Sequence, residues 1–311
     1  MDLLLTFFTG ALVAVMVMVN GGLSGRVGIY LSAVVIHVVG TVFSFVLCKV
    51  RRETIFRRRG VPVWAYLGGA IGALSTLSNN FAYGKISMTS IVALSLLGQS
   101  ITSAFFDAFG LMGLQKRRIQ RSALIGIGIS CVGAGIMLDS SVTSAFWAVL
   151  FSIATGVSLV VSRVVNARLA ERAGAMVGAF YDHLIGLPFC ALLWLLFQGR
   201  TGIAAAPAPW MLLGGVMGVA VVWLYNLVVP RVSSVRVSLL SFLGQLFTGF
   251  GIDLLTAQAI SGPLFWGGVL CAAGFSVSML LEFAEKRRAQ KRTDYWKRLA
   301  DAESAHRERL Y

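Results

Sequence analysis

The chain has 311 residues, of which 57% are hydrophobic and 13% charged, and its formal net charge is +14. A soluble domain is about half apolar and about a quarter charged. The composition therefore excludes a soluble globular enzyme, a disordered protein and a disulfide scaffold, and leaves a polytopic membrane protein. The positive charge is also typical of a nucleic-acid binder. The positions of the basic residues distinguish that class from a membrane protein.

A helix needs about 20 apolar residues to cross the hydrocarbon core of a bilayer, and ten segments qualify. In chain order they are 3–23, 29–49, 62–83, 88–113, 122–138, 144–165, 175–197, 209–229, 235–257 and 264–282. The first is expected to stay in the protein, because it lacks a basic start and a small-residue cleavage site. The connections are too short to hold a soluble catalytic domain.

The basic residues divide unequally between the two sides of such a bundle. If all ten segments cross, 23 Lys and Arg residues lie on the side of the N-terminus and three, Arg26, Lys85 and Arg200, lie opposite. Arg163, in the last turns of its segment, is expected to snorkel to the N-terminal side. Because basic residues stay in the cytoplasm, both termini are predicted to be cytoplasmic. The charge then marks topology, and nucleic acid is not an expected partner.

The two halves of the chain repeat each other. Residues 9–107 match residues 155–253, which lie 146 positions later, without a gap. The matched pairs include Gly28 and Gly174, Asn20 and Asn166, His37 and His183, Gly40 and Gly186, Asn80 and Asn226, Gln99 and Gln245, Thr102 and Thr248, and Asp107 and Asp253. Polar identities of this kind do not follow from apolar composition alone.

Each half holds five predicted spans, so the second half must enter the membrane from the opposite side. The prediction is an all-α integral membrane fold of ten transmembrane helices in two inverted five-helix repeats, 1–138 and 139–282, followed by a basic cytoplasmic tail, 283–311, that forms a surface helix. Inverted repeats are the architecture of many alternating-access carriers, whose site lies near the midplane where the repeats meet.

Five-plus-five inverted spans in about 300 residues resemble the drug/metabolite transporter superfamily. The first helix ending in Asn20-Gly21-Gly22-Leu23, the helix from Gly28 to Gly40, and the S-x-L-G-Q-x-x-T-x4-D helix that ends at Asp107 resemble its YdcZ branch of bacterial inner-membrane exporters. The resemblance implies an ion-coupled exporter in a bacterial inner membrane, here as a fused pair of repeats. It departs from the small multidrug carriers of the superfamily, which use a Glu in the first helix of each protomer. Here the first and sixth spans carry no acid.

Three carboxylates lie inside predicted spans. A charge at mid-bilayer costs at least about 2.5–3.5 kcal/mol, so Asp107, Asp253 and Asp182 are candidate proton or cation sites. For Asp107 and Asp253 the alternative is a structural role, such as capping a broken helix or pairing within the bundle. Asp182 breaks the repeat, since its counterpart is Ile36, and it is a candidate for binding an asymmetric substrate group or the coupling ion.

His37 and His183 are candidate proton relays, because imidazole titrates near neutral pH. An interhelical hydrogen bond is the other interpretation. We expect the two histidines to lie at different depths, which argues against an intramembrane enzyme.

Further polar candidates lie along helix faces. Gln99 and Thr102 follow Ser95 at one-turn spacing, and Gln245 and Thr248 follow Ser241. The glutamines either face the substrate cavity or bond each other across the pseudo-two-fold axis. Asn20, Asn80, Asn166 and Asn226 lie towards span ends, where capping competes with ligand contact.

No cofactor or metal is expected, because the four cysteines are scattered through apolar stretches and show no zinc spacing. The predicted function is a secondary active transporter, not an enzyme, that exports a small metabolite or amphipathic compound using the proton gradient. Its partners are the substrate, protons and the lipid bilayer. The alternatives are a flippase for a lipid-linked substrate and a membrane scaffold that transports nothing.

Overall fold

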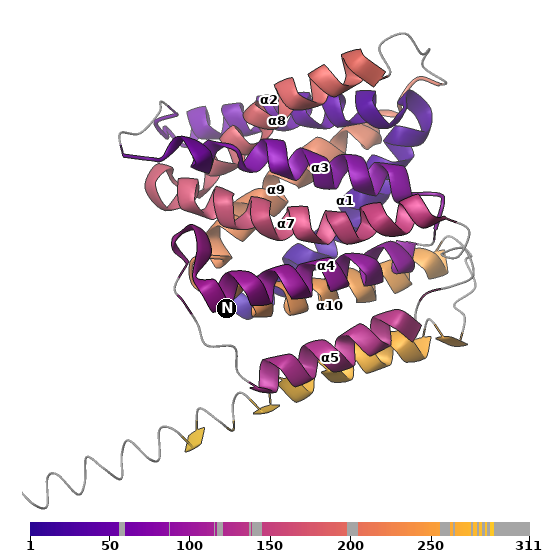
Figure 1. The fold of residues 1–311 in the computed structure, drawn as a ribbon. Helices are drawn as coiled ribbons and strands as arrows, with labels where there is room; N and C mark the ends of the chain where they lie inside the picture. The colour runs from indigo at the N-terminus through magenta and orange to yellow at the C-terminus, as the bar shows by residue number, and fades with distance from the viewer. Residues whose placement is uncertain are drawn as a thin grey trace, which may run out of the picture.

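The computed structural model describes residues 1–55, 60–86, 88–114, 116, 121–136, 138, 145–197, 205–255, 262–263, 265–274, 276–278, 280–281, 284 and 287–288. Every regular element in these ranges is a helix (Figure 1). The predicted surface helix of the tail, 283–311, lies outside them apart from residues 284 and 287–288.

The helices follow the predicted segments in order. The first half contains α1 (Asp2–Val27), α2 (Ile29–Val50), α3 (Gly68–Ala82), α4 (Met88–Phe109) and α5 (Arg121–Ile136). The second contains α7 (Phe146–Ala173), α8 (Ala175–Phe197), α9 (Leu213–Val228), α10 (Ser234–Leu255) and an apolar helix, Phe265–Ser278. Short 3-10 turns at Val63–Tyr66 and Pro209–Leu212 precede α3 and α9, and another at Leu111–Gly113 follows α4.

Seven helices in the described part of the chain are long and apolar enough to cross a membrane. They are α1, α2, α4, α7, α8, α10 and α9 taken with the 3-10 turn before it. The other three predicted spans form shorter helices. In α3 the chain leaves Pro62 as a 3-10 turn, so the α-helix begins only at Gly68.

Two equivalent glycines make the tight turns between the first two helices of each half. Gly28 joins α1 to α2 with φ 87°, and Gly174 joins α7 to α8 with φ 99°. A side chain is strongly disfavoured in this backbone region, so glycine is required at both turns. The sequence match between Gly28 and Gly174 therefore reflects the same sharp reversal in both halves.

The two halves interlock rather than forming separate bodies. The helix α1 packs on α10 and α9, while its counterpart α7 packs on α4 and α3, and α2 packs on α8 (Figure 1). The contacts match in detail: a Cβ on Gly10 would overlap the carbonyl of Ser241, and a Cβ on Gly156 would overlap the carbonyl of Ser95. Each of these four residues has its equivalent, 146 positions away, in the other contact.

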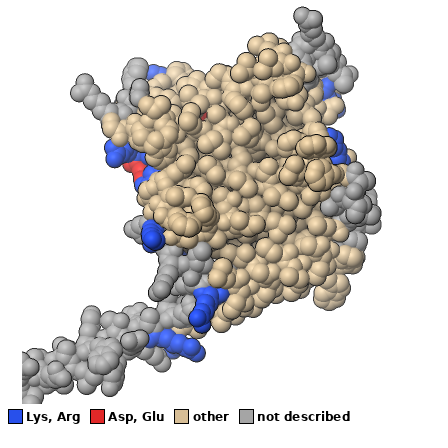
Figure 2. All heavy atoms as spheres, viewed as in Figure 1, with Lys and Arg blue, Asp and Glu red and all other residues tan. Residues whose placement is uncertain are grey.

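In Figure 2 the visible Lys and Arg side chains lie at the two ends of the helices, with a largely uncharged band between them. Most of those visible lie at the end where Figure 1 marks the N-terminus. Large apolar side chains face outward from the band, among them Val46, Phe105, Leu195 and Phe247. Such a surface suits lipid, where helices satisfy their own backbone hydrogen bonds.

Candidate functional site: a polar cavity between the two halves

A cavity of about 100 Å³ lies between the two halves of the bundle. Apolar side chains of α1, α4 and α9 form much of its wall. Its polar lining includes Asn20, His37, Asn80, Ser95, Thr155, Ser162, Asp182, His183 and Gln245. It reaches from the middle of α2 and α8 to the C-terminal end of α3 and the first turns of α4.

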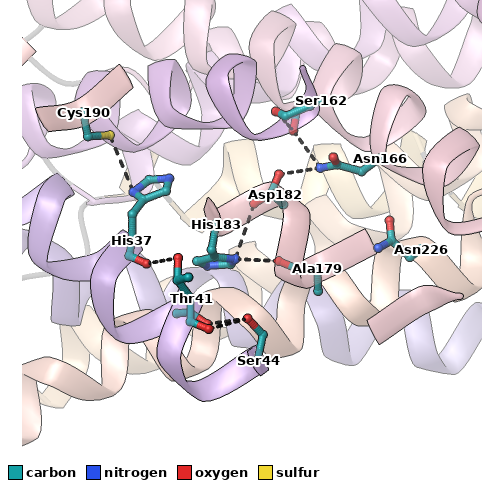
Figure 3. A network of polar contacts seen from close by, with 12 residues as sticks. His37, Thr41, Ser44, Ser162, Asn166, Ala179, Asp182, His183, Cys190 and Asn226 are labelled. Atoms are coloured by element: carbon teal, nitrogen blue, oxygen red, sulfur yellow. Dashed lines mark hydrogen bonds and ion pairs between the residues drawn. The ribbon is translucent and has the colours of Figure 1, made fainter. Parts of the chain in front are cut away.

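Asp182 is the carboxylate of this cavity, and it is buried in α8. One of its oxygens accepts a hydrogen bond of 2.6 Å from Asn166 Nδ2, and the other lies 3.6 Å from His183 Nδ1 (Figure 3). Asn166 also donates to Ser162 Oγ, which in turn donates to the backbone carbonyl of Gly68. Among the described residues, no Lys or Arg forms an ion pair with Asp182.

His37 and His183 face each other where α2 and α8 cross, with ring centroids 5.6 Å apart (Figure 3). Each Nδ1 lies close to the carbonyl four residues earlier, at 2.8 Å for Ala33 and 3.0 Å for Ala179. A carbonyl oxygen only accepts, so each Nδ1 carries a proton and Nε2 of the neutral ring is left as an acceptor. The expectation that these histidines lie at different depths is wrong, because their rings lie side by side where α2 and α8 pack together.

Two glycines allow the histidines to approach. A Cβ on Gly40 of α2 would overlap the ring of His183, and a Cβ on Gly186 of α8 would overlap the ring of His37. The two contacts are equivalent under the 146-residue relation. The paired glycines of the sequence repeat thus mark the places where each half receives the imidazole of the other.

The glutamines bond within their own helices. Gln99 Nε2 donates to Ser95 Oγ and Gln245 Nε2 donates to the Ser241 carbonyl, each at 3.2 Å. Gln245 and Ser95 line the cavity, whereas Gln99 is not among its lining residues. In the same helices Thr102 is buried and Thr248 is partly exposed.

Asp107 lies outside the main cavity, at the N-terminus of α10. Its two oxygens accept hydrogen bonds from the backbone N–H groups of Ser234, at 3.1 Å, and Val235, at 3.0 Å. These groups have no partner within the helix, so Asp107 caps α10 from the neighbouring α4. It also lines a second, polar cavity of about 280 Å³ with Arg168 and Glu171. Its counterpart Asp253 is buried in α10.

The four asparagines occupy two kinds of place. Asn20 and Asn166 sit against glycines of the opposite half, Gly214 and Gly68. Asn80 Nδ2 donates to Ser32 Oγ and Asn226 Nδ2 donates to the Ala175 carbonyl, each at 3.0 Å. Asn20 and Asn80 line the cavity, and Asn166 reaches it through Asp182.

Arg163 does not snorkel. The helix α7 continues to Ala173, about two turns beyond the predicted end at residue 165, so the guanidinium stays inside the bundle. It is 4% exposed and donates to Ser238 Oγ at 2.8 Å. Its counterpart in the repeat is Val17, so the sequence match gave no indication of this residue.

No group of three or more His, Cys, Asp or Glu side chains able to hold a metal ion is found among the described residues. The cysteines among them are free, and the sulfur of Cys190 lies 3.6 Å from His37 Nδ1.

Comparisons with known proteins give a shared fold with a solved structure and a family from a sequence model. One solved crystal structure superimposes with a TM-score of 0.68 at 18% identity, covering 90% of this chain and 96% of its own, which shows a shared fold. No curated protein matches in sequence. The family model described as "Putative inner membrane exporter, YdcZ" matches residues 1–138 and again residues 147–278. The chain therefore belongs to the YdcZ family of inner-membrane exporters in the drug/metabolite transporter superfamily, and is a multi-pass protein of that membrane.

Proposed function

We propose that the protein is a secondary active transporter of ten membrane helices in two inverted repeats, 1–138 and 139–282, which exports a small metabolite or amphipathic compound in exchange for protons. The matching turns at Gly28 and Gly174 and the crossed packing of α1 on α10 and α7 on α4 support the repeat. The three shorter helices complete the count of ten.

The observation that carries the proposal is the cluster of titratable groups in the lining of the cavity, formed by Asp182, His183 and His37. A buried carboxylate and two imidazoles lie where the halves meet, and the carboxylate of Asp182 has no described Lys or Arg as an ion-pair partner. Burying an unpaired charge is costly, so the Asp182–His183 pair is suited to hold a proton and to release it when the surroundings change. The ring centroid of His37 lies 5.6 Å from that of His183, so His37 is the next group to receive the proton.

The cavity belongs to one of two alternating states. It extends towards Asn80 and Met88, at the end of the bundle that carries few basic residues. At the other end, Ser238 bonds Arg163 and Ser103, and Asp107 caps α10. With both termini in the cytoplasm, this is an outward-facing state whose cytoplasmic end is closed.

Asp107 and Asp253 are the proposed proton or cation sites at the two ends. Asp107 is engaged while the cytoplasmic end is closed, and opening that end would free its carboxylate from the N–H groups of α10. By the repeat, Asp253 would serve α4 in the same way at the opposite end. Asn20, Asn80, Gln245 and the other polar groups of the cavity would contact the substrate.

Flux in proteoliposomes tests the proposal. A panel of metabolites is loaded, and efflux is followed with and without an inward proton gradient. We expect at least one compound to leave at least tenfold faster with the gradient than without it. Gradient-independent leakage for every compound over a broad panel would overturn the proposal and favour the flippase or scaffold alternative.

A further inference from the structure

Arg163 is a buried cation with no counter-ion in the described part of the chain. Its guanidinium donates to the neutral Ser238 hydroxyl at 2.8 Å and lies 5.0 Å from the ring centroid of Tyr225. The Tyr225 hydroxyl comes near it but falls outside hydrogen-bond geometry. Among the described residues, no carboxylate forms an ion pair with Arg163, and its Nη1 atom has no hydrogen-bond partner.

A buried charge without an opposite charge beside it destabilises the folded state, because nothing offsets the free energy of its desolvation. Stability therefore gives no reason to keep an arginine at this position. Ser234, one turn before Ser238, also carries a buried hydroxyl oxygen with no partner among the described residues. Arg163 and Ser234 line the same small recess beside Val237. A guanidinium and two hydroxyls at one place supply the donors that bind a carboxylate.

The repeat indicates when this place would open. The residues equivalent to Arg163, Tyr225, Ser234 and Ser238 are Val17, Asn79, Met88 and Val92, and all four line the present cavity. If the halves exchange conformations, as the proposed function requires, the Arg163 group lines the cavity that opens at the other end. The two cavities would then differ in chemistry, because among the described residues only the second would be lined by an arginine.

We infer that Arg163, with Ser234 and Ser238, binds the anionic group of the transported compound in the cytoplasm-facing state, and that the substrate is an amphipathic monocarboxylate. The inference rests on the proposed function. One guanidinium neutralises one negative charge, which favours a monoanion, and the largely apolar cavity wall favours an apolar body. The outward cavity offers Val17 in place of Arg163, so the anion would be bound on one side and released on the other.

Ligand binding to the purified full-length protein tests the inference. The probes are acetate, butanoate, benzoate and octanoate, each beside its neutral amide and its amine. We expect wild type to bind at least one carboxylate at least tenfold more tightly than the matched amide and amine. R231Q, which removes an exposed arginine, should keep this preference, whereas R163M and R163Q should lose it. Preference retained in the Arg163 variants, preference for the amine, or no carboxylate binding at all would overturn the inference.

Thermal unfolding without ligand separates binding from a structural role. If Arg163 is kept for an anion, R163M removes an uncompensated charge and should unfold at a higher temperature than wild type. A lower unfolding temperature in both R163M and R163Q would assign Arg163 to structure and overturn the inference. Neither measurement needs flux or a gradient. Carboxylate binding without gradient-driven flux would therefore refute the transport proposal alone, and driven flux without carboxylate preference would refute this inference alone.

Discussion

His37 and His183 lie 146 positions apart in sequence, yet their rings are 5.6 Å apart, each set against a glycine of the other's helix. The contact joins the two halves at the level of the cavity. It also brings together two residues that are equivalent in the repeat, which is expected for residues close to a pseudo-two-fold axis between the halves. A movement of the backbone in one half therefore displaces the imidazole of the other half.

Filling either glycine should disturb this contact. We expect G40A and G186A each to lower stability by about 1–3 kcal/mol, because an added methyl group in a packed interface forces its neighbours to move. Unfolding in mixed detergent measures the change. The control is G25A, where nothing beyond the adjoining residues and backbone of its own helix lies within 4 Å of the added Cβ. Equal stability of G40A, G186A and G25A would contradict this, because it would show that the histidine rings move aside at no cost in stability.

The cap at α10 predicts a second stability effect. D107A removes the acceptor of two backbone N–H groups, and loss of a cap costs about 0.5–2 kcal/mol. The same unfolding assay should show a loss of this size. The control D2A removes a more exposed carboxylate that pairs with Arg231 at 3.5 Å. Indistinguishable unfolding of D107A and D2A would argue that the cap contributes nothing to the closed end.

The closed end should also respond to a cross-link. Ser103 Oγ and Ser238 Oγ are 2.6 Å apart, on α4 and α10. We expect S103C/S238C to form a disulfide under oxidation that reduces flux at least tenfold, and a reductant to restore it. Each single cysteine variant is the control. Full flux in the cross-linked protein would mean that this end need not open.

Topology gives a prediction that needs no substrate. With both termini cytoplasmic, a C-terminal fluorescent protein should fluoresce and a C-terminal alkaline phosphatase should stay inactive in intact cells. The same phosphatase inserted at Lys85, in the connection between α3 and α4, should be active. The reversed pattern would place the cavity on the cytoplasmic side and invert the assignment of states.

Much of the fold could be predicted from sequence, because lipid restricts the choice to helices of known length. The predicted boundaries of α8, 175–197, coincide with the helix. The matched glycines and histidines also indicated where the halves correspond. Hydropathy could not show that the chain after Pro62 begins as a 3-10 turn, nor that α7 extends to Ala173 through residues polar enough to end a span.

The candidate site was predictable in residue type more than in arrangement. Asp182 and His183 were found because charged and titratable groups are rare within spans. Their neighbours were harder to find: Ser162 and Asn166 reach Asp182 only through the packing of α7 on α8. Arg163 was missed because hydropathy placed it at a helix end, and depth in a bundle depends on neighbours that a single sequence does not show.

The central claim is that substrate movement is coupled to a proton through Asp182. Proteoliposomes containing a pH-sensitive dye report it directly when a compound identified by the flux panel is added outside. Wild type should change the internal pH as the compound enters. D182N should show at least a tenfold smaller change, whereas the control D2N should show the same change as wild type. Entry of the compound into wild-type vesicles with no change in internal pH would contradict the account.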